Sequence, residues 1–310
     1  MHPIAADLAP FTDRLVGLDD VAAPVVVACS GGPDSLALLV LAAALDLAPV
    51  AVYVDHGLRA ESTDDARVVA RVAEQLGAAS RSVAVQVGPG PNLEARARDA
   101  RYEALDRVRR DVGASVVLVG HTADDQAETV LLNLLRGSAS RGLGGMAVRR
   151  DTVVRPLLAL RRSDTEAICH ALGLVPARDA MNDDTAFRRV WIRTEVLPAL
   201  SAGAERDLVP VLARQAEVLR ADSDYLDELA RAAWPPAPER TPAAALARLP
   251  LPLARRAVRQ WLGTPPPSLA EVERVLQVAR GEIRATELAP GRRVERRAGE
   301  MKCIPDSVPR

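Results

Sequence analysis

The residues best placed to do chemistry form a short turn, residues 30–35 (SGGPDS), directly after the apolar run at residues 24–29. Gly31 and Gly32 allow the backbone to adopt positive φ and to approach a ligand closely. Backbone N–H groups, two serine hydroxyls and the start of a following helix would then converge on an anion. The alternative is an ordinary strand-to-helix turn in which Asp34 only favours the helix dipole. We favour phosphate binding, because two hydroxyls and a carboxylate flank the glycines.

A second polar segment, residues 120–129 (GHTADDQAET), follows another apolar run. Thr122 and Asp125 have nearly the spacing of a capping box, so helix initiation alone explains one acid. The same first turns carry a histidine and two further acids, His121, Asp124 and Glu128. Acids that face a phosphate-binding turn would repel its ligand unless a cation lay between them. The pattern therefore predicts Mg²⁺ between these acids and the phosphate-binding turn.

Two more segments are candidates for ligand contact. Residues 54–59 (VDHGLR) end a second apolar run, and His56 could contact a nucleotide there; a solvated turn explains these residues equally well. Residues 136–146 are rich in glycine and serine. They form either a flexible linker or a lid in which Arg136 and Arg141 clamp an anionic group.

The elements that must position these turns alternate along the chain. We expect strands at residues 24–29, 50–54, 82–87 and 115–119, and helices at residues 34–45, 62–76, 92–112 and 123–135. Short-spaced alternation with continuous β-branched runs predicts an α/β fold with a doubly wound parallel sheet. Ligands bind beyond the carboxyl ends of such strands, so the turns after Cys29, Val54 and Val119 should face one site.

Beyond residue 155 the pattern is mainly helical. Helices are expected at residues 163–172, 189–200, 205–233, 242–261 and 268–279, and short strands within 283–304 that turn at Pro290-Gly291 and Ala298-Gly299. Residues 234–238 (WPPAP) should be a linker. We expect a nucleotide-binding domain at residues 1–200, a connecting helix and linker at 201–238, and a small helical or α+β C-terminal domain at 239–310.

Composition excludes several classes of protein. The chain has 310 residues, of which 48% are hydrophobic, so it can bury a core without disulfides. No run approaches the roughly 18 apolar residues of a membrane span, and no signal peptide is visible. Three dispersed cysteines without metal spacing fit a reducing cytoplasm. The net charge of −1 does not by itself indicate a nucleic-acid partner. Lys302 is the only lysine, so residues 30–35 are not a Walker-type loop, which needs one.

These motifs resemble a known family. Residues 30–35 look like the PP-loop of the N-type ATP pyrophosphatases, which bind the pyrophosphate of ATP and transfer its AMP half. Motifs in the correct order resemble the tRNA(Ile)-lysidine synthetases: VDHGLR, residues 92–102 (NLEARARDARY), residues 120–146, RPLL at 155–158, and Asn182 to Asp184 followed by RVWIR at 189–193. The resemblance covers about residues 22–200, with a weaker echo at 288–304. Val190 stands where relatives usually carry Asn, which puts any polar contact from that position in question.

The resemblance implies that lysine, ATP and tRNA(Ile) with a CAU anticodon give lysidine-modified tRNA, AMP and pyrophosphate. ATP first adenylates the C2 oxygen of the wobble cytosine, and the ε-amine of free lysine then attacks C2. The implied catalytic residues are Asp34, His121 and Asp125. The implied ATP-binding residues are Ser30, Gly31, Gly32, Pro33, Asp34, Ser35 and His56, with Mg²⁺ on Asp34 and Asp125.

Lysine recognition needs acids for its amino groups and an arginine for its carboxylate. The candidates are Asp124, Asp125, Glu128 and Arg136, whose roles the sequence does not divide. The candidate tRNA contacts are Arg98, Arg101, Arg141, Arg189, Arg193, Arg292 and Arg293. A solvated hairpin face explains the last two, together with Arg296 and Arg297, equally well.

Two other functions compete with this interpretation. A PP-loop tRNA thiolase activates a base in the same manner but delivers sulfur through paired or catalytic cysteines, and no two cysteines are close in this sequence. An ATP-binding module that has lost catalysis would not need Asp34, His121 and Asp125 intact. A homodimer, common in relatives, and the means of rejecting tRNA(Met) stay open.

Overall fold

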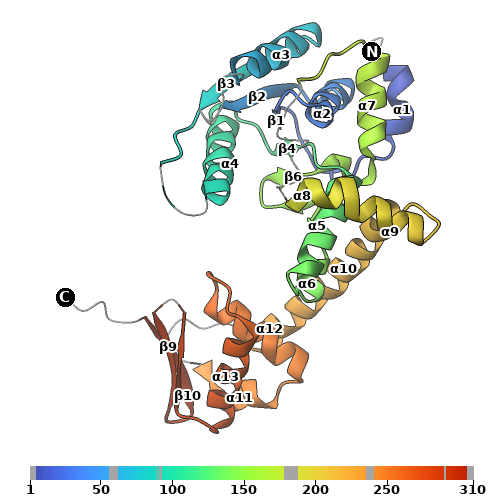
Figure 1. Cartoon of the computed structure of the whole chain (residues 1–310). Coiled ribbons are helices and arrows are strands. Elements are labelled where there is room, and N and C mark those ends of the chain that lie inside the picture. The colour runs from blue at the N-terminus through green and yellow to red at the C-terminus, as the bar shows by residue number, and fades with distance from the viewer. Residues whose placement is uncertain are drawn as a thin grey trace. The chain divides into compact units, whose positions relative to one another are not determined.

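The computed structural model describes residues 5–55, 62–88, 90, 93–177, 188–234, 241–289 and 291–305. The chain folds as two compact units, residues 1–218 and 219–310 (Figure 1). Helix α10 (Val209–Ala233) passes through the boundary between them. The expected division at residues 200 and 238 stays a prediction. No helix within the described ranges is long and apolar enough to cross a membrane.

The first unit contains a six-stranded sheet. Its strands are β1 (Val25–Ala28), β2 (Pro49–Asp55), β3 (Ala79–Ala84), β4 (Val117–Val119), β5 (Arg149–Arg150) and β6 (Val153–Val154). They lie in the order β3-β2-β1-β4-β6-β5, and all neighbours are parallel except β5 and β6. The predicted fold class is confirmed. No pattern predicts β5 or β6, because a strand of two residues is too short to show periodicity.

Strand β3 begins and ends three residues before the predicted 82–87. It is an edge strand on which five of six residues are exposed and the other is half-buried. Burial therefore imposes no clear alternation of apolar and polar residues, which is the signal that the prediction needs.

Helices cover both faces of this sheet. The helices of this unit are α1 (Ala5–Thr12), α2 (Pro33–Ala44), α3 (Ser62–Gln75), α4 (Leu93–Asp111), α5 (Ala123–Leu135), α6 (Ser140–Leu143), α7 (Arg162–Ala171), α8 (Arg188–Trp191) and α9 (Leu197–Gly203). The expected helix at 189–200 is divided, because wider helical turns at residues 192–196 separate α8 from α9. Val25, Val27 and Cys29 pack in one core with α2, and Val26 and Ala28 in another with α4. Burial on both faces explains the continuous apolar run.

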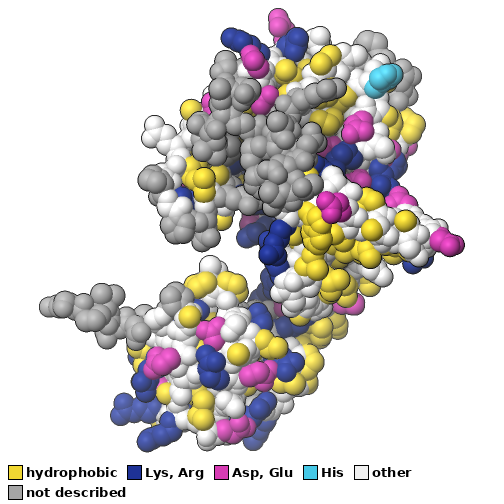
Figure 2. Space-filling view, viewed as in Figure 1, with side chains coloured by type: hydrophobic (Ala, Val, Ile, Leu, Met, Phe, Trp, Pro, Cys, Tyr) yellow, Lys and Arg dark blue, Asp and Glu magenta, His cyan; other side chains and the backbone are white. Residues whose placement is uncertain are grey.

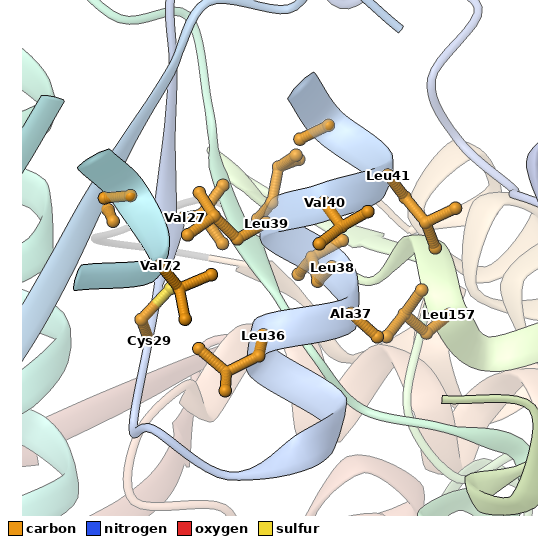
Figure 3. Packing of buried hydrophobic residues seen from close by; sticks show 14 of the residues in the cluster. Val27, Cys29, Leu36, Ala37, Leu38, Leu39, Val40, Leu41, Val72 and Leu157 are labelled. Carbon is orange, nitrogen blue, oxygen red and sulfur yellow. The ribbon is translucent and has the colours of Figure 1, made fainter. Parts of the chain in front are cut away.

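Helix α2 is buried from Ser35 to Ala42. Figure 3 shows Leu36 and Leu39 on the side of Val27 and Cys29, and Leu41 on the other side of the helix, toward Leu157. Helix α7 packs along α2. The apolar run after the glycine turn is therefore a core helix, and it fixes the turn against the sheet.

The second unit packs three helices against a four-stranded antiparallel sheet. The helices are α11 (Ala243–Arg248), α12 (Leu251–Leu262) and α13 (Leu269–Arg280), and the strands are β7 (Thr241–Pro242), β8 (Ala285–Leu288), β9 (Arg292–Arg297) and β10 (Glu300–Pro305). The single helix expected at 242–261 is two helices, because Pro250 cannot continue the first. Ala298 and Gly299 both have positive φ, as a two-residue hairpin turn requires.

The expected linker at 234–238 lies mostly outside the described residues. Trp234 itself is buried in the core of the second unit. Its ring meets that of Trp261 edge-on, with centroids 5.6 Å apart. Pro290, in the other expected turn, also lies outside the described residues.

Candidate active site

The turns after β1 and β4 meet where the strand order reverses. Strands β2 and β3 lie beyond β1 on one side, and β6 and β5 lie beyond β4 on the other. Doubly wound sheets bind ligands at such a switch point. A Cβ atom added to Gly120 would lie 3.0 Å from the carbonyl carbon and oxygen of Asp34 and 3.2 Å from the amide nitrogen of Ser35. Glycine at position 120 therefore lets the two candidate segments touch, a role that its place after a strand does not reveal.

Residues 30–35 form a turn closed by its own hydroxyls. The Ser35 hydroxyl accepts from the Ser30 amide at 3.1 Å, donates to the Gly32 carbonyl at 3.0 Å and lies 3.3 Å from the Ser30 hydroxyl. The Gly32 amide donates to the Ser30 hydroxyl at 3.4 Å. Gly31 has a φ of +87°, which only glycine adopts readily. The donors of this turn gather at the N-terminus of α2, a place that favours an anion.

Asp34 points from this turn toward α7. Its Oδ1 accepts from the Thr165 hydroxyl at 2.5 Å, and its Oδ2 lies 3.8 Å from Nε of Arg162. Burial raises the pKa of Asp34 to about 6, although the Thr165 hydrogen bond and Arg162 both oppose the rise. One carboxylate oxygen is thus fixed by a neutral donor, and the other faces a cation.

The start of α5 gives each of its acids a different environment. Asp125 completes a capping box: its Oδ2 accepts from the Thr122 amide at 2.8 Å, while its Oδ1 lies 3.4 Å from Arg162. Glu128, 3% exposed, lies 3.5 Å from the same guanidinium. Burial, together with the nearby Asp125, raises the pKa of Glu128 to about 6.

Asp124 is held by a different arginine. Its two oxygens accept from the Arg161 side chain at 3.1 Å each, and Oδ2 also accepts from the Arg162 amide at 2.8 Å. Burial alone would raise the pKa of Asp124, but these hydrogen bonds outweigh it and lower the pKa. Asp124 therefore anchors the start of α7, and only Asp125 and Glu128 face the same cation as Asp34.

Arg161, Arg162 and Thr165 are site residues that the sequence interpretation missed. A signal was available, because two arginines at the start of a helix oppose its dipole. Such a local conflict usually has a compensating interaction elsewhere in the fold. Here the compensation comes from acids at the start of α5 and from Asp207, with which Arg161 also pairs.

The donor set of the acids fits a magnesium ion completed by phosphate oxygens. Asp34 and Asp125 each direct an oxygen at the same guanidinium, so both face a place that already binds a cation. Mg²⁺ is commonly held by one or two carboxylates together with substrate phosphates. Within the described residues, no three histidine, cysteine or acidic side chains form a metal cluster of their own.

A basic pocket of about 470 Å³ lies beside this cluster. Its lining consists of Ala95, Ala97, Arg98, Arg101, Tyr102, Val119, His121 and Arg136. Arg98 stacks over the Tyr102 ring at 5.3 Å. None of the three arginines forms an ion pair with a carboxylate anywhere in the described ranges. A pocket with unpaired cations is suited to an anion.

His121 contributes an uncharged group to this pocket. Its Nδ1 is buried and has no hydrogen-bond partner among the described residues. Burial lowers the pKa of His121 to about 3, and the surrounding arginines act in the same direction. The imidazole is therefore neutral at physiological pH and offers hydrogen bonds without charge.

The other predicted tRNA contacts are dispersed. Arg189 of α8 donates to the Thr129 hydroxyl at 3.0 Å, and Arg193 lies near enough to lower the pKa of Glu128. Arg141 lies on α6. The structure thus brings Arg189 and Arg193 to the acid helix α5. His56 and the motif at 182–184 lie outside the described residues.

Arg292 and Arg293 have partners within the second unit. Arg292 donates to the carbonyls of Leu262 at 2.7 Å and Pro265 at 3.0 Å, and Arg293 pairs with Glu287 at 3.2 Å. Figure 2 shows basic and acidic side chains interspersed on the visible face of this unit. Arg292 and Arg293 therefore already have partners within the second unit. The contact of this hairpin with tRNA stays a prediction.

Comparison with known proteins agrees with this geometry. The PP-loop domain family matches residues 7–200. The solved structure of the U34-tRNA thiolase NcsA from Methanococcus maripaludis superposes with a TM-score of 0.57 at 17% identity, covering 70% of this chain and 80% of that one, and so shares the fold. The class is therefore that of PP-loop proteins.

Curated relatives define the family more narrowly. A tRNA(Ile)-lysidine synthase from Salinispora tropica is 41% identical over 97% of this chain and 96% of its own length. Another from Nocardia farcinica is 46% identical over 79% of this chain and 77% of its own. The chain belongs to the tRNA(Ile)-lysidine synthase family.

Proposed function

We propose that this protein joins free L-lysine to C2 of the wobble cytidine of tRNA(Ile) with a CAU anticodon, while ATP is converted to AMP and pyrophosphate. Relatives that share 41–46% identity carry the name of this activity. The observation that carries the proposal is the contact at Gly120, which brings the SGGPDS turn against the segment that starts the acid helix. We place the reaction in the cytoplasm.

In the first step, the C2 oxygen of cytosine attacks the α-phosphorus of ATP, and the bond to pyrophosphate breaks. The hydroxyls of Ser30 and Ser35 and the amides at the start of α2 would bind the departing pyrophosphate, exchanging their mutual hydrogen bonds for bonds to it. Asp34 and Asp125 would hold Mg²⁺, which neutralises charge on the phosphates when bound.

In the second step, the ε-amine of lysine attacks C2, and AMP leaves with the former C2 oxygen. The amine must lose a proton for this attack. Glu128 is the proposed acceptor, because its pKa of about 6 makes it a stronger base than an ordinary carboxylate. Asp125 would share in binding the ammonium group. Asp124 is less available for it, because its carboxylate already accepts two hydrogen bonds from the Arg161 side chain and one from the Arg162 amide.

The basic pocket would receive the anionic groups of the substrates. Arg136, at the end of α5, is suited to the carboxylate of lysine, and Arg98 and Arg101 of α4 to an RNA phosphate. Neutral His121 at the pocket wall would orient the cytosine or the amine through hydrogen bonds. The anticodon base must leave its stack to reach this place, as RNA readers of single bases require.

Sulfur delivery finds no support in the cysteines. Burial raises the pKa of Cys29 to about 12 and that of Cys169 to about 11. Their thiols instead contact the carbonyls of Ser35 and Pro33. Because sulfur transfer needs a thiolate, these cysteines are suited to packing around the turn.

The test is incubation of the protein with radiolabelled lysine, tRNA(Ile) and ATP. Label should enter RNA only when ATP is present, with one AMP released for each lysine incorporated. A parallel reaction with tRNA(Met), whose anticodon is the same, measures discrimination. Release of AMP without labelled RNA would refute the proposal.

A further inference from the structure

Arg162 occupies an unusual position among the acids of the site. Its side chain lies between the start of α2 and the first turns of α5, and it contacts Asp34, Asp125 and Glu128. It belongs to none of the motifs singled out in the sequence analysis. The three carboxylates come from segments about 90 residues apart, and the guanidinium contacts both segments.

These contacts are long. The guanidinium nitrogens lie 3.8, 3.4 and 3.5 Å from the nearest oxygens of the three acids. Optimised hydrogen bonds between charged groups have lengths of about 2.7–2.9 Å. Arg256 in the second unit reaches Asp227 at 2.7 Å, and Arg161 reaches Asp124 at 3.1 Å with two nitrogens. Arg162 is thus shared among three acids and bound closely by none.

Charge at the cluster is not balanced by this one arginine. Three carboxylates with side-chain exposures of 22%, 15% and 5% share Arg162. The charges of Arg189 and Arg193 also act on Glu128, but Asp34 and Asp125 together face the one guanidinium of Arg162, so the cluster retains an attraction for a further or replacing cation. Thr165 holds the other oxygen of Asp34, and Thr122 holds the other oxygen of Asp125. The carboxylates would therefore keep their orientation if Arg162 moved away.

We propose that Arg162 is a positioning residue that acts as an internal counter-ion, occupying the cation position of Asp34, Asp125 and Glu128 until a divalent cation or the ammonium group of lysine replaces it. The proposal rests on the proposed function, which brings both kinds of cation to this cluster. It predicts competition: an incoming cation binds more weakly than the carboxylates alone would allow. If the arginine occupies the position about nine-tenths of the time, the apparent Kd of the competitor is raised about tenfold.

Removal of the charge at position 162 should therefore tighten cation binding. The full chain is titrated without ATP or tRNA in two arms: Mn²⁺, followed by the electron paramagnetic resonance signal of the free ion, and L-lysine, followed by calorimetry. Arg162→Gln should lower the Kd about tenfold in at least one arm, and the arm that responds identifies the replacing cation. Arg14→Gln is the matched control, because it removes an arginine that pairs with Asp164 of the same helix at 3.0 Å, away from the cluster.

Equal or weaker binding by Arg162→Gln in both arms would overturn the proposal. If Arg162→Gln does not fold, Arg162→Lys is used instead. A lysine keeps the positive charge, but it lacks the planar guanidinium that contacts Asp34 at the start of α2 and the acids of α5 at the same time. A drop of at least twofold in its Kd supports the proposal, and an unchanged Kd overturns it. The labelled-lysine assay on the unchanged protein decides the proposed function separately, since it makes no use of Arg162 variants.

Discussion

Two sets of arginines, one in each unit, serve opposite purposes. In the first unit, Arg98, Arg101 and Arg136 line a pocket and have no carboxylate partner among the described residues. In the second unit, Arg256 pairs with Asp227 at 2.7 Å and donates to the Ser223 carbonyl at 3.1 Å. Composition and net charge do not distinguish the arginines that line the pocket from the paired Arg256. The partners of each guanidinium, rather than the number of arginines, indicate where an anionic substrate would bind.

The largest effect should come from the acid beside the glycine turn. Asp34→Asn keeps the size of the side chain but removes the charge that would hold a cation against the phosphates. Incorporation of labelled lysine should fall by about a thousandfold, the upper range for loss of one electrostatic contact in an active site. Asp20→Asn, which breaks only the exposed pair with Arg149, is the control and should keep full activity. Equal activity in the two variants would show that the site is misplaced.

A smaller loss is expected for the unpaired arginines. Arg101→Gln removes a positive charge from the pocket without leaving a carboxylate unpaired. The kcat/KM for tRNA should fall roughly 10- to 150-fold, as expected for loss of about 1.5–3 kcal/mol from a charged hydrogen bond. Thermal unfolding should change little. If the variant unfolds at a much lower temperature but keeps full turnover, Arg101 has a packing role and does not differ from the paired arginines of the second unit.

The paired arginine should behave in the opposite way. Arg256→Gln removes the guanidinium that pairs with Asp227, a carboxylate that is 7% exposed. Loss of one member of a buried pair typically costs about 3–5 kcal/mol of stability. Denaturant unfolding should show this loss, while lysine incorporation at low temperature stays close to that of the unchanged protein. A large drop in kcat with unchanged stability would contradict this assignment.

The smallest effect concerns the charge of His121. Its pKa of about 3 means that the folded protein does not protonate this ring where an unfolded chain, with a histidine pKa near 6.5, does. Stability should therefore decrease as the pH falls from about 6.5 toward 3. Proton NMR, with His121→Gln to assign the ring signal, should show no titration of this ring between pH 5 and 8. A midpoint near 6.5 would place His121 in contact with water or an acid.

The sequence predicts the strands and helices around the site well because they carry strong periodic signals. Strand β1 and helix α5 are found at or within two residues of the predicted ranges. Toward the edges of the sheet the prediction is poorer: the exposed strand β3 is placed three residues too late, and β5 and β6, with two residues each, are missed. Local patterns contain little information about such elements.

Contacts between distant segments are what the sequence could not supply. Arg162 lies 37 residues after Asp125 and Thr165 lies 131 residues after Asp34, and only the packing of α7 on α2 brings them to the site. The division of roles among the acids of α5 depends on the same contacts. Asp124 is anchored by Arg161, which a count of acids on one helix cannot reveal.

We propose that ATP is held at residues 30–35, across from the acids of α5. A crystal structure of the protein with a non-hydrolysable ATP analogue and magnesium tests this claim most directly. We expect the β- and γ-phosphates within hydrogen-bond distance of the Ser30 and Ser35 hydroxyls and the Gly31 and Gly32 amides. Phosphates bound anywhere else, with this turn still closed on its own hydroxyls, would contradict it.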